Sequence, residues 1–140
     1  MSLSAHESLP RFDEIRTEDI VPTVRALITQ QDERRSELEA RLAGGLTPTW
    51  DSVAVPVSQL SEPLSYAWNI VHHLLSVKNT PALREAEQTV QGEVVAAALR
   101  LGQSRAIYEA TKAIRGSAAW ATLEEARRRI IESGIQAAEL

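Results

Sequence analysis

Hydrophobic residues recur at spacings of three and four along most of the chain, which is the period of helices that pack on one face. The first apolar stripe follows Thr17, a capping-type residue, and two acidic residues, and it stops at Gly44 and Gly45. Its members are Ile20, Val24, Leu27, Ile28, Leu38 and Leu42. A polar gap over residues 30–37 separates the two groups, so we predict one long helix whose middle faces solvent on all sides.

A second stripe keeps a single register from residue 53 to residue 75, across two prolines. Its members are Val53, Val57, Leu60, Leu64, Ala67, Trp68, Val71, Leu74 and Leu75. Pro56 and Pro63 each remove a backbone donor, so a helix with a kink or a short restart near Ser61 is predicted here.

A third helix is predicted to start at Pro81, because proline suits the first helical position and Asn79 and Thr80 can supply the cap. Residues 76–81 are therefore expected to form the turn of an αα-hairpin. The predicted buried positions of this helix are Leu83, Ala86, Val90, Val94, Ala98 and Leu101.

Two further helices are predicted after residue 103. One runs from about Ser104 to Ile114, and its expected buried side chains are Ile107, Tyr108, Thr111 and Ile114. The other follows an interruption, "RGSAAWA", and a capping box formed by Thr122 and Glu125. Its expected apolar side consists of Leu123, Ala126, Ile130 and Ala137.

No alternation of period two occurs, so the predicted fold class is all-α: antiparallel helical hairpins in a bundle of about five helices. Residues 1–8 are expected to be a disordered lead or a cloning remnant. Residues 9–140 are expected to form a single helical domain, a size at which one core is normal.

Composition narrows the classes of function. Fifteen basic residues against nineteen acidic ones give a net charge of −4, so we predict no nucleic-acid partner. The chain has no cysteine, which excludes disulfides and thiolate metal sites and fits a reducing, cytoplasmic location. No apolar run is long enough for a membrane span, and the first ten residues lack the pattern of a secretory signal, so no membrane partner is predicted.

Histidines are the only nitrogen ligands available for a metal. His72 and His73 are consecutive, so on a helix they point about 100° apart, whereas helical zinc pairs sit four residues apart. His6 with Glu7 lacks the second histidine of a zincin motif and is interpreted as a tail residue. We therefore predict no metal ligand in this chain.

The remaining candidates have structural interpretations. Ser76 and Ser104 lack a nucleophile motif, and the glycine pair lacks the pattern of a phosphate loop. The acidic pairs Glu18–Asp19 and Glu124–Glu125 suit first helical turns, and Arg127, Arg128 and Arg129 suit a solvated face. Trp50, Trp68 and Trp120 are interpreted as core or inter-helix anchors. No catalytic, cofactor-binding or metal residue is predicted.

Several stretches carry a family resemblance. In order they are "LPRFDEIRTEDIVPTVRALI", "TWDSVAVPVSQL", "HLLSVKNTPALREA", "IYEATKAIR" and "ATLEEARRRIIESGI". They resemble the N-terminal helical region of the thimet oligopeptidase and neurolysin family of zinc metallopeptidases, on the oligopeptidase A side of that family. The resemblance covers roughly Leu9 to the end, and its most specific part runs from Ser76 to Glu85.

The resemblance implies a neurolysin-like N-terminal domain of an enzyme that hydrolyses short peptides. In that family, zinc is bound by His-Glu-x-x-His and a downstream glutamate in the C-terminal catalytic region, which would be the domain's partner. This chain holds neither, so the resemblance implies an inactive piece that helps shape the substrate channel. A stand-alone helical module that binds a protein or peptide without cutting it is the alternative, and an independent enzyme has no supporting residue set.

A domain separated from a larger enzyme is expected to leave apolar faces exposed, and such faces drive self-association. We predict a homo-oligomer of the isolated chain through faces bearing some of Val53, Val57, Trp68 and Ile131.

Overall fold

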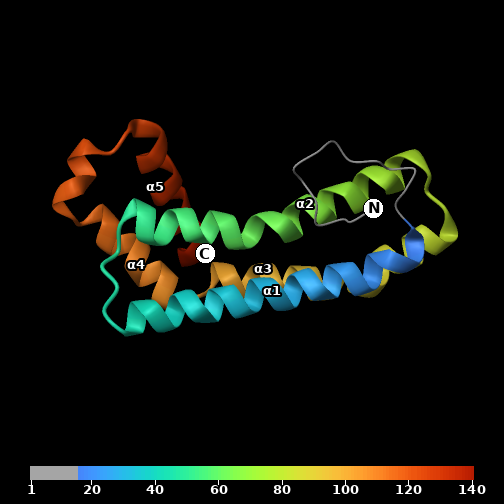
Figure 1. Ribbon diagram of the computed structural model, residues 1–140. Helices are drawn as coiled ribbons and strands as arrows, with labels where there is room; N and C mark the ends of the chain where they lie inside the picture. Colours follow the sequence, from blue (N-terminus) through green and yellow to red (C-terminus); the bar gives the residue numbers. More distant parts are fainter. Residues whose placement is uncertain (1–15) are drawn as a thin grey trace. The chain divides into compact units, whose positions relative to one another are not determined.

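The structure, a computed structural model, describes residues 16–140. The expected lead over residues 1–8, the expected start near Leu9 and the tail residues His6 and Glu7 lie outside the described residues. Five α-helices and no strand occur in the described part of the chain, which confirms the all-α prediction (Figure 1). The helices are α1 (Thr17–Ala43), α2 (Val55–Val77), α3 (Pro81–Gly102), α4 (Arg105–Arg115) and α5 (Glu125–Glu139). Two short turns of other helical types are η2 (Trp50–Ala54) and η3 (Ala118–Thr122).

The chain divides into two compact units, each assembled from segments that are distant in the sequence. Within the described residues, unit 1 contains residues 16–33 and Leu60–Ala98. Unit 2 contains Arg34–Gln59 and Leu99–Leu140. The single domain expected over residues 9–140 stays a prediction.

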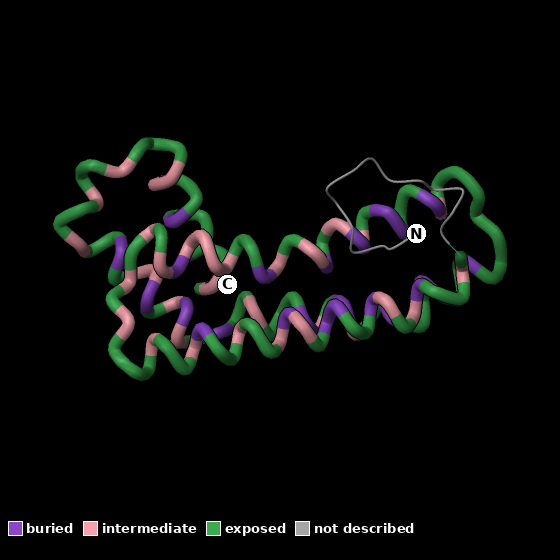
Figure 2. Tube along the Cα trace, viewed as in Figure 1, coloured by how far each residue is buried: buried purple, intermediate pink, exposed green. Residues whose placement is uncertain are grey.

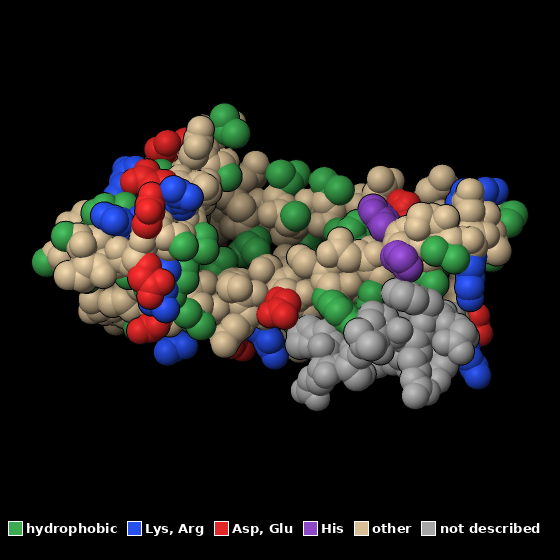
Figure 3. Space-filling model, turned by 90° about the horizontal axis from the view of Figure 1, so that it is seen from above, with side chains coloured by type: hydrophobic (Ala, Val, Ile, Leu, Met, Phe, Trp, Pro, Cys, Tyr) green, Lys and Arg blue, Asp and Glu red, His purple; other side chains and the backbone are tan. Residues whose placement is uncertain are grey.

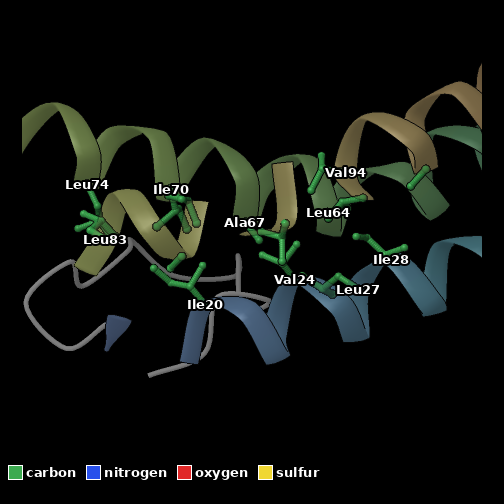
Figure 4. Close-up of a cluster of buried hydrophobic side chains, with 14 residues drawn as sticks. Ile20, Val24, Leu27, Ile28, Leu64, Ala67, Ile70, Leu74, Leu83 and Val94 are labelled. Atoms are coloured by element: carbon green, nitrogen blue, oxygen red, sulfur yellow. The ribbon is translucent and has the colours of Figure 1, made fainter. Parts of the chain in front are cut away.

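Unit 1 is built on a core shared by parts of α1, α2 and α3 (Figure 4). The stripe of α1 faces that of α2, with Ile20, Val24 and Ile28 among the buried side chains. Hydrogen bonds join Arg25 to Glu93 and Gln31 to Ala97, so α1 and α3 run in the same direction. Helix α2 lies between them in the sequence and runs in the opposite direction (Figure 1). Burying side chains of this size contributes about 1.5–3 kcal/mol each, which makes this core the main source of stability in unit 1.

The turn between α2 and α3 has the predicted chemistry. Thr80 Oγ1 accepts the backbone N–H of Leu83 at 3.2 Å, and Pro81 occupies the first helical position. Asn79 has a φ of 39°, a left-handed conformation that asparagine tolerates better than most residues. The expected αα-hairpin turn over residues 76–81 is confirmed.

One predicted core position of α3 is wrong. Ala98 is exposed, and the neighbouring Ala97 is fully buried, because the stripe advances by three residues after Val94 and not by four. The Ala97 carbonyl accepts a hydrogen bond from the buried Gln31 amide at 3.4 Å. The other predicted members Leu83, Ala86, Val90 and Val94 are buried, and Leu101 is half-buried.

The expectation that the middle of α1 faces solvent on all sides is also wrong. Gln31 is only 3% exposed, and Arg35 and Glu39 are half-buried one and two turns further on. Arg35 pairs with Glu39 at 2.9 Å, and the Glu39 carboxylate also accepts the hydroxyl of Ser104. Polar side chains therefore continue the inner face because each finds a partner there.

The α1 helix ends as predicted at its two glycines. The N–H of Gly45 donates to the Leu42 carbonyl and the N–H of Leu46 donates to the Arg41 carbonyl, which together form a Schellman motif. Gly45 has a φ of 103°, a conformation that strains residues with a side chain.

The short restart near Ser61 is absent, because α2 is one helix through Pro63. The irregular turn lies earlier, in the π-helical η2, where Thr49 and Ser52 form a reciprocal capping box. The kink weighed as the alternative to a restart stays a prediction.

Unit 2 has a smaller core, made by α4, α5 and η2. Its buried members are Val53, Ala110, Ile114, Ile131 and Ile135, with Trp50, Tyr108 and Trp120 packed partly buried against them. Ser104 caps α4 through the backbone N–H of Ile107, as expected for a helix that starts near this residue. Tyr108 and Thr111, two predicted buried positions of α4, are only half-buried, while Ala110 is buried in their place.

The predicted register of α5 is wrong. Its buried residues are Ile131 and Ile135, whereas Ala126, Ile130 and Ala137 are exposed. The expected capping box is absent as well, because Thr122 lies in η3 and donates its hydroxyl to the Ala119 carbonyl. Figure 2 shows α5 as a mostly exposed helix with isolated buried positions.

This register also corrects the predicted oligomer face. Val53 and Ile131 are 1% and 3% exposed inside the core of unit 2, so neither can bind a second copy in the folded chain. Val57 and Trp68 are half-buried. The homo-oligomer itself stays a prediction.

Candidate functional site

The two described histidines lie on α2 and both reach the surface, where Figure 3 colours them purple. The imidazole of His72 lies against the indole of Trp68, one helical turn earlier, with ring centroids 4.9 Å apart and planes tilted by 50°. The backbone carbonyl of His73 accepts the hydroxyl of Ser76 at 2.7 Å. The neighbouring histidines therefore have different surroundings, and no group of three potential metal ligands occurs within residues 16–140.

The hydroxyls of Ser76 and Ser104 form hydrogen bonds with the backbone and, for Ser104, with a carboxylate. Ser104 is 6% exposed, and its hydroxyl donates to Glu39 Oε2 at 2.5 Å and accepts the N–H of Ile107. Ser76 donates to a backbone carbonyl and Ser104 donates to a carboxylate, so these contacts do not form a nucleophile activated by histidine. Sequence reasoning missed the Glu39–Ser104 pair, which joins α1 to the cap of α4 across 65 positions of sequence.

The acidic pairs lie where they were predicted. Glu18 and Asp19 are in the first turn of α1, and Glu124 and Glu125 are at the start of α5. Glu125 binds Arg129 at 2.8 Å, one turn along the same helix. These carboxylates therefore complement helix dipoles and surface charge.

The three consecutive arginines of α5 do not form one basic patch. Arg129 is exposed and paired with Glu125. Arg127 instead lies over the Trp50 ring, with its guanidinium carbon 5.0 Å from the ring centroid. The solvated face expected for this cluster is thus wrong for Arg127, which is half-buried because the indole attracts and covers it.

Each tryptophan anchors a core, as predicted. Trp68 packs against the core of unit 1, and Trp50 and Trp120 pack against the core of unit 2. All three are half-buried.

Two polar contacts change the titration of surface groups. Arg25 holds Glu93 through two nitrogens, at 3.1 Å from Nε and 2.9 Å from Nη2, and this hydrogen bonding raises the pKa of Arg25 and lowers the pKa of Glu93. The Tyr108 hydroxyl donates to Glu139 at 2.7 Å, and that bond, with some burial, raises the pKa of Tyr108. Lys112 Nζ lies 5.0 Å from the same ring. Both contacts fix one helix against another.

Several polar and aromatic side chains considered above therefore serve as helix caps, ion pairs or ring contacts within the described residues. None of the described helices is long and apolar enough to cross a membrane.

The family described as Neurolysin/Thimet oligopeptidase, N-terminal domain, matches residues 24–140. The chain belongs to this family, and the resemblance drawn from the sequence is confirmed.

Curated relatives agree with this assignment. The chain is 40% identical over 131 residues to the Organellar oligopeptidase A, chloroplastic/mitochondrial, and to the Probable cytosolic oligopeptidase A, both of Arabidopsis thaliana. It is 30% identical over 132 residues to the Oligopeptidase A of Escherichia coli strain K12. These matches cover 94% of the chain but only 16%, 18% and 19% of the relatives, so the chain spans less than a fifth of their length.

Proposed function

We propose that this chain is the N-terminal domain of an oligopeptidase A-like zinc metallopeptidase that hydrolyses short peptides. The observation that carries the proposal is the family match over residues 24–140, together with relatives named oligopeptidase A that align with nearly the whole chain. The catalytic region in the rest of such an enzyme is the proposed partner, and short peptides are the proposed substrates.

In this proposal the chain shapes part of the substrate channel and supplies neither zinc ligands nor catalytic residues. The donor set of the described residues supports it, because the adjacent His72 and His73 diverge on α2 and no group of three potential metal ligands occurs within residues 16–140. In this proposal no zinc ion is bound by residues 16–140, and the chain takes no step of the hydrolysis.

A cytoplasmic location is part of the proposal. It is supported by the relative named probable cytosolic, although another relative is named as organellar. Imaging a fluorescent protein fused to the complete reading frame in the native cell would distinguish a cytosolic from an organellar location.

The most direct test is a chimera in which this chain replaces the matched segment of the Probable cytosolic oligopeptidase A of Arabidopsis thaliana. The chimera should hydrolyse a short fluorogenic peptide in a zinc-dependent reaction, whereas the 140-residue chain alone should not. A folded but inactive chimera would count against the proposal.

The alternative, a stand-alone binding module without catalysis, has a separate test in the genomic reading frame. A frame that continues into a His-Glu-x-x-His sequence supports the peptidase, and a stop codon directly after Leu140 supports the alternative.

A further inference from the structure

We draw no further inference here: the strongest candidate, the exposed apolar surface patch of α3 at Val95 and Leu99, carries none because nothing in the described part of the chain shows what covers it.

Discussion

The two units use different means to hold their helices. In unit 1, fourteen buried hydrophobic residues from three helices form one cluster, whereas the cluster of unit 2 has five buried members. Unit 2 adds half-buried aromatic rings and polar contacts, such as Arg127 on Trp50 and Ser104 on Glu39. The core of unit 1 gains most of its stability from apolar surface area removed from water. The stability of unit 2 depends more on a few particular contacts.

The largest expected effect comes from creating a cavity in each core by the same substitution, isoleucine to alanine. Ile70→Ala in unit 1 should lower the free energy of unfolding by about 4–5 kcal/mol, and Ile114→Ala in unit 2 by about 2–3 kcal/mol, because a cavity in the larger cluster relaxes less. Both side chains are at most 4% exposed, so they lose similar contact with solvent on folding. Urea unfolding followed by circular dichroism measures both. An equal or larger loss for Ile114→Ala would contradict the contrast between the units.

A buried polar anchor of unit 2 should have the next largest effect. Ser104→Ala removes the cap of α4 and one partner of the Glu39 carboxylate, and should cost about 1–2 kcal/mol. Ser76→Ala is the matched control, because Ser76 is exposed and bonds only to a carbonyl of its own helix. It should change stability by less than about 0.5 kcal/mol, and an equal effect of the two variants would rule out a special role for Ser104.

The contact between Tyr108 and Glu139 should appear as a pH dependence of stability. Since the pKa of Tyr108 is raised in the folded chain, its stabilisation is complete below the unfolded pKa of about 10 and is lost as pH rises through the higher folded value. Tyr108→Phe should lower the urea midpoint at pH 7 slightly and remove this alkaline loss. Titration of tyrosine absorbance is the second readout, and an alkaline loss that persists in the variant would assign the effect to another group.

The exposed pair of unit 1 should matter least. The lowered pKa of Glu93 means that its stabilisation is complete above the unfolded pKa of about 4.3 and is lost as pH falls through the lower folded value. Glu93→Gln should shift the urea midpoint less than Ser104→Ala, and the shift should shrink in about 1 M salt because both partners are exposed. A large, salt-independent shift of the urea midpoint would contradict this, because it would mean that the Arg25–Glu93 pair contributes a large part of the stability of unit 1.

The sequence predicted the helices of unit 1 well because their buried faces are apolar over many turns. It failed where buried faces are polar, since Gln31 and Glu39 give no hydrophobic signal and are recognised only with their partners Ala97 and Ser104. The Trp68–His72 contact could have been found, because residues four apart on a helix are neighbours.

The register of α5 could not be settled by periodicity alone. Ile131 and Ile135 form one apolar face, while Ala126, Ile130 and Ala137 form another of similar strength. The choice depends on which face the rest of unit 2 covers, and the core of unit 2 covers Ile131 and Ile135. The capping box predicted from Thr122 and Glu125 was wrong for a similar reason, because Thr122 belongs to η3 and α5 begins only at Glu125.

The proposed function implies that this chain contributes shape to a peptidase and that the reactive metal is bound by residues outside the chain. Equilibrium dialysis of the 140-residue chain against micromolar zinc, followed by elemental analysis, tests this claim most directly. We predict no stoichiometric zinc in the dialysed chain. One tightly bound zinc per chain that is lost in His72→Ala or His73→Ala would contradict it.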